Sequence, residues 1–242
     1  MTKVSLVLTT FNSKELLKHT IESIKEQTYE NIEIIIQDGL STDGTLEIIK
    51  EYADENSNVN WVSEKDSGLY DAMNRGIKRA TGDLIVCFND LFATKDSVLD
   101  IVSTFEANPG VVGVHADLIY EENGKIIRDW KMGEGRIIDG WLPAHPTMFL
   151  KKEIYEKYGL YDTSYKCSAD YEYMLRFLCD ENNRLAYLPK LVVRMFYGGT
   201  STSGISGYWT SVWESYKALK KNKVKRAGYI IFRRIIKVVK QF

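Results

Sequence analysis

Short apolar runs alternate with segments of helical periodicity over residues 4–88, and this alternation leaves few possible folds. The runs are residues 4–10, 32–37, 61–62 and 84–88. After the first run, Leu17, Ile21 and Ile24 recur at helical spacing, and the later intervals repeat this arrangement. Strands and helices that alternate at this interval predict βαβ units, and therefore an α/β fold with a mostly parallel central sheet flanked by helices.

The pattern changes in the second half of the chain. Residues 112–118 alternate in polarity, and the sequence Glu-Asn-Gly at 122–124 is a hairpin signal before a second run at 125–130. A strand at 148–150 and a helix at about 169–179 follow. We therefore expect a mixed second half, and the segment after Gly204 reads as a helical tail.

Composition supports one decorated globular domain. The 242 residues are 44% hydrophobic and 27% charged with four prolines, and we find no repeat or low-complexity segment. The formal net charge of -1 hides an asymmetry, because residues 217–240 contain ten Lys or Arg and no acid. Such a tail favours anionic surfaces.

The cysteines and the N-terminus indicate a cytoplasmic protein. Cys87, Cys167 and Cys179 are odd in number and have no metal-ligand spacing, so we interpret them as reduced. The chain begins with a strand-like run instead of a signal peptide, and no stretch approaches the roughly 20 apolar residues of a membrane span.

Polar residues follow each predicted strand of the first half. They are Thr9, Thr10 and Asn12; Asp38, Ser41 and Asp43; Glu64, Asp66 and Gly68; and Asn89 and Asp90. In an open parallel sheet, ligands bind beyond the carboxyl ends of the strands. Carboxylates gathered there repel one another unless they bind a cation or accept hydrogen bonds from a ligand, which indicates a metal-diphosphate or a base and ribose. Asn12 and Glu15 also have the spacing of a capping box at the start of a helix.

The motifs together resemble family 2 glycosyltransferases of the GT-A fold, and are most similar to the bacterial polysaccharide and lipopolysaccharide assembly type. The matching segments are residues 4–12 (VSLVLTTFN), 38–45 (DGLSTDGT), 66–76 (DSGLYDAMNRG), 80–83 (ATGD), 145–149 (HPTMF), 158–162 (YGLYD) and 169–172 (ADYE). The resemblance covers about residues 3–200. It implies a domain at 1–204, with a nucleotide-binding half at 1–93 and an acceptor half at 94–204, before a basic amphipathic tail at 205–242.

The resemblance implies roles for two groups of residues. The nucleoside pocket would contain Thr9, Asn12, Asp38 and Asp66. The sugar or the donor loop would be served by Gly68, Asp71 and Asn74. A carboxylate in the first group could accept from a uracil N–H or a ribose hydroxyl.

The metal motif departs from the family pattern. Asp90 matches one acid of the motif that brings Mg²⁺ or Mn²⁺ to the diphosphate, but residues 87–93 read CFNDLFA and retain only one of the usual paired aspartates. Asp90 could still coordinate an ion whose other ligands are waters and phosphate oxygens. Weakened metal binding or lost activity is an alternative that the sequence leaves open.

The resemblance also implies an acceptor side. Asp170 matches the catalytic base, which would take the acceptor hydroxyl proton in a single inverting displacement. Glu172 would assist acceptor binding, and His145 would contact the diphosphate or support the metal site. The partners implied are a UDP-sugar and a lipid-linked glycan acceptor, without nucleic acid.

Other functions stay as alternatives. A non-catalytic protein that binds a nucleotide or partner would have the same fold, whereas a nicotinamide oxidoreductase lacks support because no G-x-G-x-x-G follows the first strand. The tail is interpreted as a peripheral membrane contact through 217–242 at the inner face of the membrane, although docking on the domain or on a second subunit is also open. Its expected apolar face is Ile231, Phe232, Ile235, Val238, Val239 and Phe242, opposite Arg226, Arg233, Lys237 and Lys240.

Overall fold

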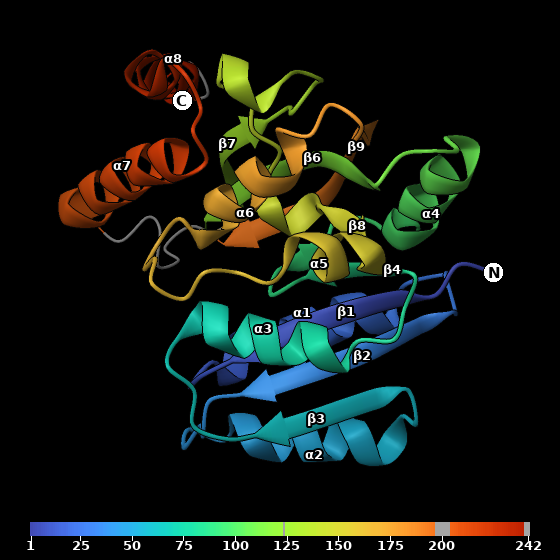
Figure 1. Cartoon of the computed structure of the whole chain (residues 1–242). Helices are drawn as coiled ribbons and strands as arrows, with labels where there is room; N and C mark the ends of the chain where they lie inside the picture. The colour runs from blue at the N-terminus through green and yellow to red at the C-terminus, as the bar shows by residue number, and fades with distance from the viewer. Residues whose placement is uncertain (123, 197–203, 240–242) are drawn as a thin grey trace.

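A single mixed sheet organises the molecule (Figure 1). The structure is a computed structural model that describes residues 1–122, 124–196 and 204–239. Its sheet has the strand order β3-β2-β1-β4-β8-β6-β9-β5, with β7 paired to β6. The strands are β1 (Val4–Thr10), β2 (Ile32–Asp38), β3 (Val59–Ser63), β4 (Leu84–Cys87), β5 (Leu91–Phe92), β6 (Gly113–Glu122), β7 (Lys125–Trp130), β8 (Phe149–Lys151) and β9 (Leu185–Phe196).

The predicted division into a parallel and a mixed half is confirmed. Strands β3, β2, β1 and β4 are parallel neighbours. Strand β8 then runs antiparallel to both β4 and β6, β6 and β7 form the predicted hairpin, and β5 runs antiparallel to β9. β6 and β9 are again parallel. The parallel half brings the carboxyl ends of β1 to β4 to one edge.

Helices cover both faces of the sheet (Figure 1). They are α1 (Lys14–Lys25), α2 (Thr45–Glu55), α3 (Leu69–Arg79), α4 (Ser97–Ala107), α5 (Lys152–Tyr158), α6 (Ala169–Leu178), α7 (Gly204–Lys221) and α8 (Ala227–Val239), with 3₁₀ turns η1 (Ile137–Asp139) and η2 (His145–Thr147). Because side chains alternate along a strand, β1 sends Leu6 and Leu8 to the core under α1, α2 and α4, and Val7 to the core under α3, α5 and α6.

Several elements, including the short strand β5, have no counterpart among the predicted ones. Helix α4 and the short helix α5 were not predicted, and neither was β9, the strand that spans the mixed half of the sheet. Pro189 lies within β9, where β6 and β9 change register between Ala116 and Leu118. Proline removes a ladder donor, so a strand containing it is hard to recognise from its sequence.

The tail helices share a core with the domain. Ala218 and Leu219 of α7, and Ala227 and Ile230 of α8, are buried in the same cluster as α6. Among the described residues, no helix combines the length and apolar character that crossing a bilayer requires. Cys87, Cys167 and Cys179 form no disulfide.

Candidate active site at the carboxyl edge of the sheet

Thr9 and Asn89 join the ends of β1 and β4. The Thr9 N–H donates to Asn89 Oδ1 over 2.8 Å, and Asn89 Nδ2 donates to Thr9 Oγ1 over 2.7 Å. Both bonds fix the backbone that leads into Asp90. The structure therefore gives Thr9, a predicted nucleotide-binding residue, a second task, which is to hold the segment that carries the predicted metal ligand.

Asp38 is a structural centre of the edge. Its carboxylate is fully buried and accepts hydrogen bonds from Thr10 Oγ1 at 3.0 Å, Ser41 N at 3.0 Å, Ser41 Oγ at 2.5 Å and Ser63 Oγ at 2.6 Å. These donors shape the loop between β2 and α2 around the carboxylate. The contact of Asp38 with a nucleobase stays a prediction.

Asn12 links the first two loops and does not cap α1. It has φ +46°, its N–H donates to Ser41 Oγ at 2.8 Å, and its Oδ1 accepts from Thr42 N at 2.9 Å. The predicted capping box is wrong, because Ser13 is the N-cap of α1 and makes no side-chain cap hydrogen bond. A left-handed backbone at residue 12 turns the chain sharply at the sheet edge, and Phe11 projects outward.

Phe11 is a candidate site residue that the sequence patterns did not single out. Its ring is 66% exposed beside Gly39 and Asp66, and a Cβ on Gly39 would lie 2.8 Å from Asp66 Oδ2 and 3.3 Å from Phe11 Cδ2. An exposed aromatic face next to a half-buried carboxylate suits a base and ribose. The available signal was a large aromatic directly after the first strand.

Asp71 organises the loop that precedes α3. Its Oδ2 accepts from Ser67 N at 3.0 Å and from Arg75 at 2.9 Å, and these contacts, led by the Ser67 N–H, lower the pKa of Asp71. Gly68 has φ +124°, and its N–H donates to Asp66 Oδ1 at 2.9 Å. Only glycine adopts this backbone readily, so the loop around Asp66 depends on residue 68.

Asn74 connects α3 to the segment before α6. Its Nδ2 donates to Tyr161 O and its Oδ1 accepts from Tyr161 N, both at 2.9 Å, and the side chain is buried. In this structure Asn74 therefore joins α3 to the backbone at Tyr161. Its predicted contact with a sugar has no exposed group to make it.

Asp90 carries an unpaired carboxylate at the end of β4. Within the described part of the chain it has no hydrogen-bond or ion-pair partner, and burial raises the pKa of Asp90 to about 7. A desolvated carboxylate without donors is costly, so this position fits a cation. The described residues contain no group of three His, Cys, Asp or Glu side chains that could bind one ion, so Asp90 would need ligand or water oxygens to complete a shell.

Asp170 lies in the first turn of α6. Its Oδ1 accepts from Tyr70 Oη at 3.2 Å and from Tyr171 N at 2.8 Å. Burial raises the pKa of Tyr70 far above its usual value, and the Asp170 charge adds to this shift, so the phenol stays a neutral donor. Both bonds use Oδ1, and among the described residues Oδ2 accepts no hydrogen bond.

Tyr120 of β6 is a buried phenol whose ionisation both carboxylates oppose. Burial raises the pKa of Tyr120, Arg128 opposes this shift, and the charges of Asp90 and Asp170 add to it. The predicted metal ligand and the predicted base are far apart in sequence, yet both favour the neutral form of this phenol.

His145 lies in the 3₁₀ turn η2, and its side chain is neutral. Its Nε2 is 2.7 Å from Tyr161 Oη, and burial lowers the pKa of His145 while the Asp170 charge opposes that shift. The ring is half-buried. His145 can therefore offer a neutral hydrogen-bonding nitrogen, and its bond to Tyr161 fixes the ring orientation.

Glu172 is not available to an acceptor. Its side chain is fully buried, with Arg176 Nε at 2.9 Å, Lys221 Nζ at 3.0 Å and Asn222 Nδ2 at 3.3 Å. The predicted acceptor role is therefore corrected to a structural one. Lys221 and Asn222 come from the tail, so Glu172 ties α6 to the end of α7.

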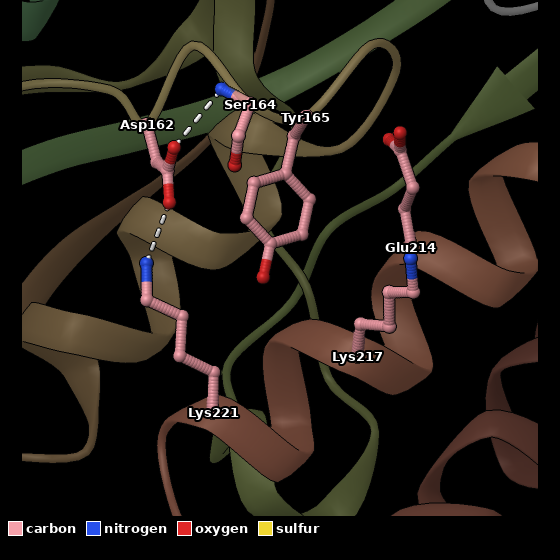
Figure 2. A pocket seen from close by; sticks show the side chains of 6 residues that line it. All are labelled: Asp162, Ser164, Tyr165, Glu214, Lys217 and Lys221. Atoms are coloured by element: carbon pink, nitrogen blue, oxygen red, sulfur yellow. Dashed lines mark hydrogen bonds and ion pairs between the residues drawn. The ribbon is translucent and has the colours of Figure 1, made fainter.

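Glu214 of α7 holds the chain that enters α6. Its Oε1 accepts from Lys166 N at 2.8 Å, and its Oε2 accepts from Cys167 N at 2.8 Å and Ser168 N at 3.1 Å. Figure 2 shows the adjoining pocket of about 180 Å³, where Lys221 reaches Asp162 at 2.7 Å. The tail thus positions the turn that carries Asp170.

Replacing Glu214 by alanine is expected to lower the free energy of unfolding by about 3 kcal/mol, because three backbone donors lose their acceptor. Glu214→Gln keeps one acceptor oxygen and is expected to lose less. Urea denaturation measures both, with Glu51→Ala on the exposed side of α2 as the control. Equal stability of Glu214→Ala and this control would contradict the anchoring role.

The match to a family model identifies the protein family of this chain. The model described as glycosyl transferase family 2 matches residues 5–176, which include every predicted site residue. The chain belongs to glycosyl transferase family 2. It is a glycosyltransferase, as the resemblance implied, and α7 and α8 lie outside the matched region.

Curated relatives agree with this family. A PGL/p-HBAD biosynthesis glycosyltransferase of Mycobacterium bovis is 29% identical over 201 residues, covering 80% of this chain and 73% of that protein. A dolichyl N-acetyl-alpha-D-glucosaminyl phosphate 3-beta-D-2,3-diacetamido-2,3-dideoxy-beta-D-glucuronosyltransferase of Methanococcus voltae is 28% identical over 214 residues, covering 79% and 66%.

Solved structures confirm the GT-A fold. S. aureus TarS in complex with UDP-GlcNAc has a TM-score of 0.71 at 17% identity, covering 96% of this chain and 71% of that chain. The mannosyltransferase PcManGT from Pyrobaculum calidifontis, in complex with GDP-Man and Mn2+, has a TM-score of 0.69 at 17% identity, covering 95% and 70%.

Proposed function

We propose that this glycosyltransferase moves a hexose or N-acetylhexosamine from a UDP-sugar to a hydroxyl of a lipid-linked glycan in surface polysaccharide synthesis, with inversion. The observation that supports the proposal is an Asp90 carboxylate without a protein partner among the described residues at the carboxyl edge of the sheet, together with an Asp170 carboxylate at the start of α6 that accepts from Tyr70 of α3. TarS, whose structure is similar, was solved with UDP-GlcNAc, which supports uridine as the nucleoside of the donor. The Methanococcus voltae relative is named for transfer to dolichyl N-acetyl-alpha-D-glucosaminyl phosphate, which supports a lipid-linked acceptor.

Asp170 would act as the base through Oδ2. Its Oδ1 already accepts from Tyr70 Oη and Tyr171 N, so these donors orient the carboxylate and leave the second oxygen to take the proton of the acceptor hydroxyl. The hydroxyl oxygen then bonds to the anomeric carbon as the bond from that carbon to the diphosphate breaks. One displacement on the opposite face inverts the anomeric configuration.

Asp90 would hold Mg²⁺ or Mn²⁺ at the diphosphate. When bound, the ion neutralises the negative charge that develops on the leaving group. Thr9 and Asn89 fix the backbone before Asp90, and His145 is a neutral donor or acceptor for the diphosphate on the Asp170 side. PcManGT was solved with Mn2+, which supports a divalent cofactor.

Phe11 would stack on the base, with Asp66 beside it for the ribose or base donors. Phe11→Ala is expected to weaken UDP binding by about tenfold, because one base-aromatic stack contributes on the order of 1–3 kcal/mol. Calorimetric titration with UDP and Mn²⁺ measures this change. Leu99→Ala, which removes an exposed side chain on α4, is the control. An unchanged Kd for Phe11→Ala would place the base elsewhere.

Product analysis tests the proposed reaction. A screen of nucleotide sugars by thermal shift, with and without Mn²⁺, identifies the donor, since ligand binding raises the melting temperature. Transfer from that donor to a hydroxyl acceptor, followed by the anomeric coupling in the NMR spectrum, reports the stereochemistry. We expect an inverted product; nucleotide binding without turnover under any metal would favour the non-catalytic alternative.

A lipid-linked acceptor would place the protein at the inner face of the cytoplasmic membrane. The basic tail, residues 217–242, is the part of the chain that we propose contacts this membrane.

A further inference from the structure

We infer that α7, α8 and the turn between them form a membrane-binding face for anionic phospholipids, which deepens the membrane contact proposed above and rests on it. We call this surface the tail face. It consists of Trp213, Tyr216, Lys220, Lys223, Lys225, Arg226, Tyr229, Phe232 and Ile236. Figure 1 shows both helices at the outer side of the acceptor half.

An apolar stripe runs along the outer side of α8. Tyr229, Phe232 and Ile236 are 54%, 60% and 40% exposed and follow one another at helical spacing. The opposite side of α8 is used by the fold, because Ala227 and Ile230 are 6% and 1% exposed. The stripe is therefore left over after the helix has docked on the domain.

This arrangement revises the apolar face expected from the sequence. Phe232 is outward as expected, but Ile231 and Ile235 are half-buried. Arg234 lies over the Tyr171 ring at 3.9 Å, so one cation of the tail also packs on the domain. The side chains of residues 237–239 and all of residues 240–242 lie outside the described part.

Cations gather at the end of the stripe where α7 meets α8. The turn encloses a hollow of about 540 Å³ lined by four of them, Lys220, Lys223, Lys225 and Arg226. Among the described residues these four side chains form no ion pair, and residues 217–240 contain no acid. The N-terminus of α8 opens at the same turn, and its backbone N–H groups add to the attraction for anions.

Lys221 differs from the other lysines of the turn because it is ion-paired to the domain. Its Nζ is 2.7 Å from Asp162 and 3.0 Å from Glu172, although its side chain stays 48% exposed. The lysines on either side of it project outward into the hollow or the solvent. Lys221 therefore contributes to the structure, whereas Lys220, Lys223, Lys225 and Arg226 are available to bind phosphate groups.

Aromatic side chains connect α7 to this surface. Trp213 is 57% exposed and stacks on Tyr216 with ring centroids 5.9 Å apart, and Tyr216 lines the hollow. Exposed Trp and Tyr beside Lys and Arg are typical of segments that lie at the membrane interface. The charge favours anionic phospholipids over a neutral bilayer, and the apolar stripe supplies the part that inserts.

Vesicle sedimentation of the full chain tests the tail face. We expect binding to vesicles of phosphatidylcholine with phosphatidylglycerol, and little binding to phosphatidylcholine alone. The double variant Lys223→Ala with Lys225→Ala is expected to bind about thirtyfold more weakly, because each Lys or Arg near an anionic surface contributes about 1 kcal/mol. The paired control is Lys50→Ala with Lys78→Ala, two exposed lysines of α2 and α3.

A second variant tests the apolar stripe. Phe232→Ser with Ile236→Ser is expected to lose vesicle binding, whereas Leu99→Ser, at 40% exposure the match of Ile236, keeps it. UDP binding by all these variants is expected to equal that of the wild type, which separates failure of the tail face from failure of the proposed reaction. Equal binding to neutral and anionic vesicles would overturn the inference. So would a dimer in solution that the stripe variant dissociates, because the face would then bind a second copy.

Discussion

Replacing Asp170 by asparagine is expected to lower kcat by about a thousandfold, while the Kd for the donor stays close to the wild-type value. The amide keeps the shape of the side chain and an oxygen that accepts from Tyr70 and Tyr171, but it cannot take the acceptor proton. Steady-state rates of transfer and calorimetric titration with UDP measure the two quantities separately.

Asp54→Asn, on the exposed side of α2, is the control for this change. It makes the same chemical substitution where the carboxylate touches neither α6 nor the sheet edge. If Asp170→Asn kept a kcat within about tenfold of the control, Asp170 would not be the base. A large loss of donor affinity would instead indicate that Asp170 contacts the nucleotide sugar.

Replacing Asp90 by asparagine is expected to remove the activation by Mn²⁺ and to lower kcat/KM at saturating metal by about a hundredfold. The reason is that Asp90 is the carboxylate at the edge without a protein partner among the described residues, and an amide is a poor ligand for a hard cation. Initial rates against Mn²⁺ concentration, and UDP titrations with and without the metal, measure the effect.

Stability distinguishes a metal ligand from a structural aspartate at residue 90. Burial raises the pKa of Asp90 to about 7, so the charged carboxylate does not stabilise the metal-free fold. The metal-free Asp90→Asn variant is therefore expected to have an unchanged or slightly higher free energy of unfolding. A clear loss of stability would show that Asp90 serves the fold, and an intact Mn²⁺ response would show that the metal binds elsewhere.

The sequence predicts the parallel half of the fold well, because its strands and helices can be located from the periodicity of apolar residues and from their order along the chain. Apolar runs and helical spacing locate β1 to β4 and the helices between them, and the rule that ligands bind at carboxyl ends places Asp38, Asp66 and Asp90 at one edge. The mixed half is less accessible. Strand β9 contains Pro189 and pairs with β6 across a shifted register, which no local pattern reports.

Site roles that depend on distant partners could not be predicted from local motifs. Asp38 is enclosed by Ser63 from the end of β3, and Glu172 is enclosed by Lys221 from α7. Both acids occupy motif positions, yet burial gives them structural tasks. Phe11 differs in the opposite way. It is an apolar residue, which the sequence alone would place in the core, but its side chain is exposed at the sheet edge.

The tail also has a structural role that its composition does not predict. Its charge indicates attraction to anions, but the same segment supplies Glu214, which holds three backbone N–H groups before α6. A matched family region that ends at residue 176 gives no guide to this contact. The tail helices therefore combine an inner face that positions the turn before Asp170 with an outer face that we propose meets the membrane.

Crystals soaked with UDP and MnCl₂ provide the most direct measurement of the proposed site. We expect a manganese anomalous peak on the Asp90 carboxylate, the uracil against Phe11, and the diphosphate on the side of the edge that faces Asp170. A manganese peak away from Asp90, or a nucleotide bound outside the edge formed by β1, β2 and β4, would contradict the proposed arrangement.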